Sequence, residues 1–183
     1  MRFLTRSFVA VCFAALGLSA AALARHPDSP RPPDAPPKAV SDADFVTKAA
    51  SGGMFEVQSS KMATEMAKKA ECKAFAEKMI ADHSKLNDEL KAAAGKAGIA
   101  VPSTLAAHHE KMLADLKGAR DFDAAYLSAQ VKAHEEAVAL FTAASASVKD
   151  PGLREFATKS LPALKTHLEH AKKHAGSGTI SSR

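Results

Sequence analysis

The sequence of 183 residues contains no Trp, one Tyr and two Cys. It has no cluster of basic residues interleaved with aromatic ones, because its Lys residues alternate with Asp and Glu. Nucleic-acid binding is therefore not expected. The sequence also lacks a phosphate-binding loop, a Ser nucleophile motif, a Cys-x-x-Cys pair and a His-Glu-x-x-His zinc motif. Nothing in it indicates a nucleotide-dependent enzyme, a hydrolase or a thioredoxin-like protein.

The first 24 residues have the composition of an export signal. Arg2 and Arg6 provide a basic start, residues 8–23 are almost wholly apolar, and Ala22-Leu23-Ala24 has the small-x-small pattern that signal peptidase cleaves. The apolar run is too short and too rich in Ala to favour a permanent membrane anchor. We therefore expect cleavage after about Ala24, no transmembrane anchor in the mature protein, and a periplasmic or secreted location.

Cleavage would leave Cys72 as the single cysteine, which excludes an internal disulfide. One interpretation, which we favour, is a part-buried thiol near the start of a helix. The alternative is an intermolecular disulfide, which would form a dimer through Cys72 in an oxidising compartment.

The remaining chain divides into three parts by composition. Residues 25–41 contain six prolines and few apolar residues, which predicts a disordered, extended linker. Residues 42–174 carry the apolar periodicity of a folded helical domain. Residues 175–183 are rich in Gly and Ser and are predicted to be a disordered tail.

Apolar residues recur every three or four positions in four long segments, as in helices with one buried face. We predict long helices over residues 43–69, 71–98, 122–149 and 151–174, with Ser41 as the first N-cap and a kink at Pro162.

A short additional helix is predicted from Pro102 to Lys117, with Ser103 as its N-cap and Gly118 as its stop. His108 and His109 lie on this helix and are predicted to be at the surface or at the rim of the bundle. The connection between the second and third long helices therefore exceeds 20 residues, which indicates two antiparallel hairpins joined by a crossover. The predicted fold is all-α: a ferritin-like four-helix bundle with a short extra helix in the crossover.

One polar residue lies on the buried face of each of the first three long helices, and one lies at the edge of that face on the fourth. These residues are Glu56, His83, His134 and His167. Antiparallel helices rise about 1.5 Å per residue in opposite directions, so residues equidistant from a turn lie at the same height. Glu56 and His83 are equidistant from the first predicted turn, as are His134 and His167 from the second. All four would meet if the two hairpins also align in height.

Two interpretations of these four residues stay open. One carboxylate and three imidazoles could bind a single Zn²⁺, Cu²⁺ or Fe²⁺ ion, with Asp82 and Tyr126 contacting the ligands from outside. Alternatively, the same groups form a hydrogen-bonded polar core without metal, which we favour. His170 and His174 are spaced to chelate a surface metal, but their lysine neighbours favour a solvated face.

Four segments resemble the domain of unknown function 4142 family, over about residues 42–173. They are Glu56 in a helix containing Gly52 and Gly53, MIADHSKL at residues 79–86, FDAAYLSAQVKAHEEAVALF at residues 122–141, and LPALKTHLEHA at residues 161–171. The resemblance implies an exported bacterial protein with a ferritin-like fold, and it implies no activity.

Ferritin-like di-iron proteins take a Glu-x-x-His motif from each of two helices. Here Ile80, Val131 and Leu164 stand three residues before the core histidines. Di-iron ferroxidase activity is therefore not expected, and the sequence predicts one metal ion at most.

These features predict a non-enzymatic periplasmic protein, linked to envelope stress, with a polar core that could hold one metal ion. Two alternatives stay open. The first is a mononuclear metal-dependent redox enzyme, which would need a solvent path to the core. The second is a lipid- or partner-binding bundle, which an exposed apolar groove over the crossover helix would favour.

Overall fold

The structure is a computed structural model, and it describes residues 38–177. Within these residues it contains five α-helices and no β-strand, as the all-α prediction requires. The helices are α1 (Asp42–Met66), α2 (Ala70–Lys96), α3 (Ala107–Lys117), α4 (Phe122–Ser147) and α5 (Pro151–Ser177). The predicted export signal, most of the proline-rich segment and residues 178–183 lie outside the described residues.

The ends of α1 follow from local and tertiary hydrogen bonds. Ser41 is the N-cap, as predicted, and its hydroxyl accepts a hydrogen bond from the backbone N–H of Asp44 at 3.2 Å. α1 ends three residues before the predicted Lys69. The backbone N–H groups of Lys68 and Lys69 donate to the Asp123 carboxylate, at 3.0 and 3.1 Å. The Asp123 carboxylate on α4 thus fixes the turn between α1 and α2. Helical periodicity in the sequence does not indicate this contact.

The start of α3 was predicted wrongly. α3 begins at Ala107 with Ala106 as its N-cap, and Ser103 does not cap it. The backbone N–H of Ala106 donates to the Ser51 hydroxyl of α1 at 2.8 Å, which holds the preceding segment against α1 in an extended conformation. Gly118 ends the helix as predicted.

The remaining helix ends lie close to their predicted positions. α2 ends at Lys96, and Gly98 follows with φ of 69°, the left-handed conformation that glycine adopts after a helix. α5 continues through Pro162 and ends at Ser177, so the first residues of the predicted tail are helical.

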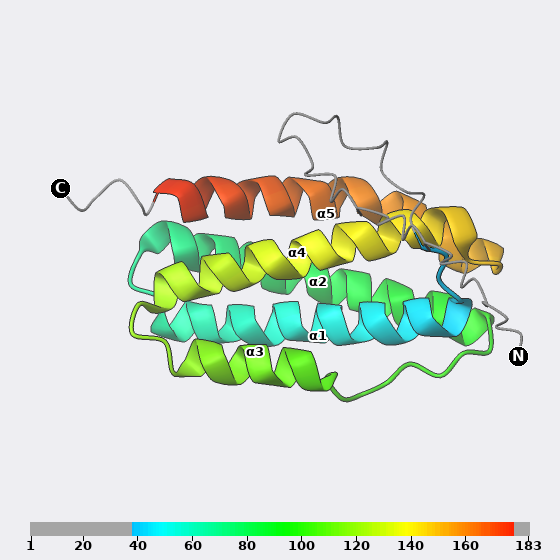
Figure 1. The fold of residues 1–183 in the computed structure, drawn as a ribbon, viewed down its shortest axis with the longest axis horizontal. Coiled ribbons are helices and arrows are strands. Elements are labelled where there is room, and N and C mark those ends of the chain that lie inside the picture. The colour runs from blue at the N-terminus through cyan, green and yellow to red at the C-terminus, as the bar shows by residue number, and fades with distance from the viewer. Residues whose placement is uncertain (1–37, 178–183) are drawn as a thin grey trace, which may run out of the picture. The chain divides into compact units, whose positions relative to one another are not determined.

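The four long helices lie side by side (Figure 1). α1 packs against α2 and α4, and α5 packs against the same two helices from the other side. α1 and α2 run antiparallel, as do α4 and α5, and the chain crosses the length of the helices between α2 and α4. α3 lies within this crossover and packs on α1 and α4.

The buried side chains form two apolar clusters. The first cluster is centred on Phe45, Phe141 and Phe156, with Phe45 and Phe141 in edge-to-face contact at 5.1 Å between ring centroids. The second cluster contains Phe75, Met79 and other apolar residues from the opposite halves of the long helices. On each long helix one buried polar residue lies in sequence between the two clusters: Glu56, His83, His134 and His167. The core therefore has a polar layer between two apolar ones.

Cys72 lies in the first turn of α2, and only 3% of its surface is exposed. Burial, followed by the nearby Asp123 carboxylate, raises the pKa of the Cys72 thiol to about 12. A buried, protonated thiol is a poor nucleophile. The structure therefore favours a structural thiol over an intermolecular disulfide through Cys72.

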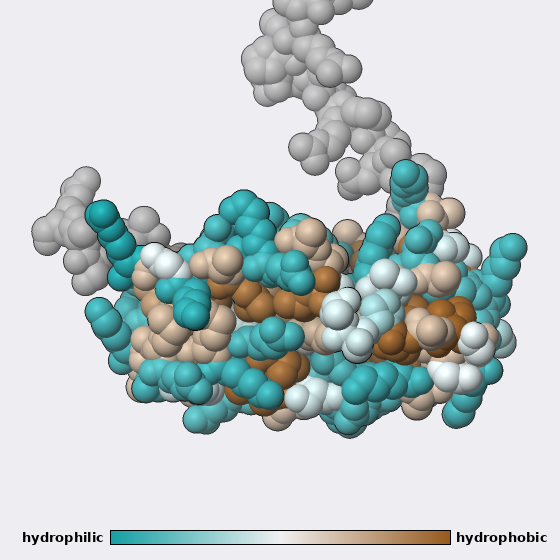
Figure 2. Space-filling model, turned by 90° about the horizontal axis from the view of Figure 1, so that it is seen from below, coloured by the Kyte–Doolittle hydropathy of each residue, from teal (hydrophilic) through white to brown (hydrophobic). Residues whose placement is uncertain are grey.

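The surface of the described residues offers little continuous apolar area. Among residues 38–177, Met66 is the large hydrophobic residue with an exposed side chain, at 41%. On the face shown in Figure 2, apolar areas are separated by hydrophilic side chains. Among the described helices, none combines the length and the hydropathy needed to cross a membrane.

Two adjacent glycines of α1 provide a test of this packing. A methyl group on Gly53 would collide with the Asn87 side-chain amide of α2, whereas one on Gly52 would make ordinary contact with His109 at 3.9 Å. Gly52→Ala should therefore raise the free energy of unfolding by up to about 1 kcal/mol, the helix-propensity difference. Gly53→Ala should give no gain or a loss, measured by urea denaturation. Equal gains from both substitutions would contradict the close approach of α1 and α2, and Asn87→Ala should relieve the Gly53→Ala defect.

Candidate metal centre

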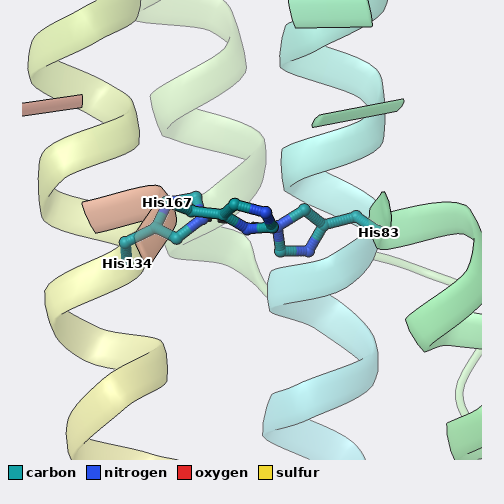
Figure 3. A group of neighbouring side chains, drawn as sticks. All are labelled: His83, His134 and His167. Atoms are coloured by element: carbon teal, nitrogen blue, oxygen red, sulfur yellow. Dashed lines mark hydrogen bonds between the residues drawn. The ribbon is translucent and has the colours of Figure 1, made fainter. Parts of the chain in front are cut away.

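The structure brings the four polar residues of the predicted core to one level. Glu56 comes from α1, His83 from α2, His134 from α4 and His167 from α5. Each is at most 3% exposed. Figure 3 shows the three imidazole rings converging between the helices, and their centroids lie 5.2 to 5.5 Å apart. The two hairpins therefore do align in height.

Glu56 determines the tautomer of His83. The Nδ1 atom of His83 lies 2.7 Å from Oε2 of Glu56, so it carries the proton and donates to the carboxylate. A neutral imidazole has one N–H and one bare nitrogen. In the neutral form of His83 the bare nitrogen is therefore Nε2.

A backbone carbonyl determines the tautomer of His134. Its Nδ1 atom lies 2.9 Å from the carbonyl oxygen of Gln130, one turn earlier on α4. A carbonyl can only accept, so Nδ1 of His134 carries the proton and Nε2 is bare. Nothing in the sequence indicated this partner, because a backbone carbonyl leaves no side-chain signal.

Asp82 has the same role for His167. Oδ2 of Asp82 accepts a hydrogen bond from Nε2 of His167 at 2.8 Å and from Nζ of Lys78 at 2.7 Å. This leaves Nδ1 of His167 bare, and that buried atom has no hydrogen-bond partner within the described residues. Asp82 thus occupies the outer position considered for it from the sequence.

The three bare nitrogens belong to rings that meet at one point. His83, His134 and His167 each offer one ring nitrogen, and these three nitrogens all lie within 4.8 Å of one another. The Nε2 atoms of His83 and His134 are only 3.3 Å apart. Two nitrogens bound to one ion at about 2.0–2.1 Å and a tetrahedral angle would lie about 3.3 Å apart. These three residues, the three-histidine centre, fit a single transition-metal ion.

Glu56 and Tyr126 occupy other positions than the metal interpretation gave them. Glu56 is not among the residues whose ligand atoms converge, and it holds His83 from behind. Its second oxygen, Oε1, lies 3.5 Å from Nδ1 of His134 and finds no hydrogen-bond partner among residues 38–177. Tyr126 pairs instead with the Ser60 hydroxyl at 2.8 Å, which links α4 to α1.

The electrostatics of the centre favour neutral His134 and His167 rings beside a charged carboxylate. Burial by itself would raise the pKa of Glu56, but the opposing effect of His83 and His134 is larger in sum and lowers it to about 2. Burial lowers the pKa of His134, and burial followed by His83 lowers the pKa of His167 to about 4. At neutral pH, His134 and His167 therefore have the protonation state that metal binding requires.

A cavity of about 230 Å³ reaches this centre. Glu56 and His83 line it, and so do His108, His109 and Glu136. Its other walls are largely apolar, from α1, α2, α4 and α5. Since His108 and Glu136 have exposed side chains, the cavity connects the centre with the surface.

The predicted surface position of His109 was wrong. His109 is 5% exposed, lies 2.7 Å through Nδ1 from the Ser51 hydroxyl, and stacks on Phe55 with ring centroids 5.1 Å apart. The packing of α3 on α1 turns this residue inward, while its neighbour His108 is exposed as predicted.

Comparisons with known proteins give one family and one similar fold. A family model described as "Domain of unknown function (DUF4142)" matches residues 28–173. Among solved structures, "CopM in the Cu(II)-bound form" aligns with a TM-score of 0.66 and 18% sequence identity, covering 76% of this chain and 98% of that one. At this identity the similarity shows a shared fold. A search of curated proteins gave no significant match.

The lowered histidine pKa values make the metal-free protein sensitive to acid. The ordinary pKa of a histidine is 6.5 and that of His167 is about 4, so between these values the unfolded chain binds more protons than the folded chain. The free energy of unfolding should therefore fall as the pH is lowered from 6.5 to 4. Urea denaturation followed by circular dichroism at several pH values measures this fall.

The matched variants are His167→Gln, which keeps a donor for Asp82, and His108→Gln at the surface. His167→Gln should show a smaller loss of stability between these pH values than the wild type, and His108→Gln should not. A loss of the same size in all three proteins would contradict the burial of a neutral His167.

Proposed function

The chain belongs to the domain of unknown function 4142 family, and we propose that it is an exported, non-enzymatic helical protein that binds one transition-metal ion. The ligands are His83, His134 and His167, and copper is the metal that the chemistry favours. The family description names no activity, so the proposal rests on the site.

The proposal is supported by the direction in which the three imidazole N–H groups point, which is away from the centre. Each N–H donates outward, to Glu56, to the carbonyl of Gln130 or to Asp82, at 2.7 to 2.9 Å. Each bare nitrogen is left in the interior, where two of them face one another at 3.3 Å. Facing lone pairs repel unless a cation lies between them, and a bound metal ion would supply that positive charge.

The hydrogen-bonded polar core, favoured by the sequence alone, accounts for the arrangement less well. One additional proton between the Nε2 atoms of His83 and His134 would turn their contact into a hydrogen bond. It would leave Nδ1 of His167 buried without a partner. A buried polar atom of this kind costs about 1–3 kcal/mol. A metal ion lying between the three rings would satisfy all three nitrogens at once.

The donor set limits which metal is expected. Neutral imidazoles suit Cu²⁺ and Zn²⁺, whereas Mg²⁺ and Ca²⁺ prefer oxygen ligands. Cu²⁺ stands highest in the affinity order of divalent first-row metals. The structural neighbour named for its Cu(II)-bound form supports the same choice.

We place this role in the bacterial envelope. Residues 1–24 would direct export, and the five helices would form a ferritin-like four-helix bundle with α3 in its crossover. The two antiparallel hairpins and the long connection between α2 and α4 support this architecture. Binding would lower the free concentration of the ion in that compartment, which is the link to envelope stress that we infer.

The cavity supports a second candidate function, a mononuclear redox enzyme. Catalytic metal sites combine three protein ligands with an open position. The cavity that reaches Glu56 and His83 would give a small substrate access to such a position. Turnover of peroxide or a reductant that disappears in a His134→Ala variant would favour catalysis over binding.

Metal content tests the proposed function most directly. The mature protein, purified without a His-tag and incubated with Cu²⁺, should retain one tightly bound equivalent per chain after passage over a chelating resin. His134→Ala and His167→Ala should each lose it, measured by elemental analysis, because two imidazoles remain. His170→Ala removes an exposed histidine and should keep the equivalent, whereas failure of the wild type to retain metal would refute the proposal.

The outer hydrogen bonds provide a graded test. Groups that orient metal-binding histidines contribute about 10–100-fold to affinity. Asp82→Asn should therefore weaken Cu²⁺ binding by about this factor without abolishing it, measured by competition with a chelator of known affinity. Asp88→Asn, which alters an exposed ion pair with Lys91 on the same helix, should leave the affinity unchanged. Equal effects of the two substitutions would contradict the role of Asp82.

A further inference from the structure

A second group of ligand-type side chains lies at the other end of the cavity. His108, His109 and Glu136 each offer one ligand atom, and these atoms lie within 4.8 Å of one another. We call this group the outer site. His108 and Glu136 are exposed, with 57% and 46% of their side-chain surfaces accessible. The distance from Nε2 of His108 to Oε2 of Glu136 is 3.8 Å, too long for a hydrogen bond, so these atoms are available to a ligand.

His109 is held rigidly in this group. Its Nδ1 atom is engaged with the Ser51 hydroxyl at 2.7 Å, and that hydroxyl also accepts from the backbone N–H of Ala106. Phe55 stacks on the ring at an interplanar angle of 17°. The nitrogen left for a ligand is Nε2. Burial lowers the pKa of His109 to about 4, so the ring is neutral at physiological pH.

The outer site and the three-histidine centre share one cavity. His108, His109 and Glu136 line it, and so do Glu56 and His83. Small residues, Gly52, Ala133 and Ala137, also line the cavity and leave room for a hydrated ion. One cavity therefore touches both the exposed His108 and the buried His83.

We propose that the outer site binds Cu²⁺ or Zn²⁺ from solvent and passes it through the cavity to the three-histidine centre. Two imidazoles and a carboxylate are a suitable donor set for either ion. The transfer step rests on the proposed function, whereas the outer site itself rests only on its own residues.

The outer site should bind more weakly than the three-histidine centre. His108 and His109 lie in the first turn of α3, and the positive end of a helix dipole opposes a cation there. Two of its three ligands are also exposed side chains, which lose conformational freedom when they bind an ion. Weak binding is what transfer requires, because a tightly held ion would not leave.

The probe is Cu²⁺ alone, added in steps to the mature chain and followed by electron paramagnetic resonance. The wild type should bind a second, weaker equivalent after the first. The double variant His108→Gln/Glu136→Gln should lose this second equivalent and keep the first. His170→Gln/Glu135→Gln removes the same residue types outside the cavity and should keep both. Circular dichroism checks folding, and His109 is left intact because it is buried.

The rate of loading tests the transfer. In stopped-flow mixing with Cu²⁺, the outer-site variant should fill the three-histidine centre about tenfold more slowly than the wild type or the control, since it lacks the anionic capture site. A second equivalent that persists in the variant overturns the outer site. Loss of that equivalent with an unchanged loading rate supports the outer site and overturns the transfer.

The same titration separates this inference from the proposed function. Suppose that the wild type binds a single weak equivalent, which His134→Ala leaves unchanged and His108→Gln/Glu136→Gln removes. That result supports the outer site and refutes metal binding by the three-histidine centre. Binding of one tight equivalent alone, with no second equivalent in the wild type, overturns the outer site and leaves the proposed function intact.

Discussion

Donation of each imidazole proton to an acceptor outside the centre is the constraint on which the site depends. Glu56, the Gln130 carbonyl and Asp82 each take one N–H. Without them the rings could reverse their tautomers and satisfy one another, and no set of bare nitrogens would result. The acceptors differ in kind, one buried carboxylate, one backbone carbonyl and one half-exposed carboxylate, but their effect on the rings is the same. The nitrogen that each ring turns toward the centre is therefore decided by groups outside the three-histidine centre.

The rest of the core keeps these groups in place. Polar residues occupy the middle of every long helix, and apolar clusters lie on both sides of them along the helices. Burying Glu56 and three histidines opposes folding unless their hydrogen bonds are satisfied. The two apolar clusters supply the stabilisation that offsets this cost. The close approach of α1 and α2 at Gly53 belongs to the same arrangement, since it brings the helices that carry Glu56 and His83 together.

The crossover connects this interior with solvent. α3 is short, but it packs on α1 and α4 and places His108 and His109 at the cavity. Ser51 fixes both the segment before α3 and the ring of His109. One hydroxyl of α1 thus sets the geometry of the outer site. The crossover distinguishes this fold from a simple up-down bundle. It also carries His108 and His109, two of the three residues of the outer site.

Much of the fold could be predicted from the sequence, because helical periodicity, caps and turn residues are local signals. The long helices, the cap at Ser41, the stop at Gly118 and the three core histidines all follow from spacing along the chain. The equal heights within each hairpin follow from the rise of the helix alone.

Tertiary structure decided those features that residue spacing along the chain does not determine. It set the alignment of the two hairpins, the ends of α1 and α3, and the inward position of His109, because partners distant in sequence fix each of them. Above all it decided which nitrogen of each histidine is bare. That property depends on a single hydrogen-bond acceptor about 3 Å away, and only the packed helices determine where that acceptor lies.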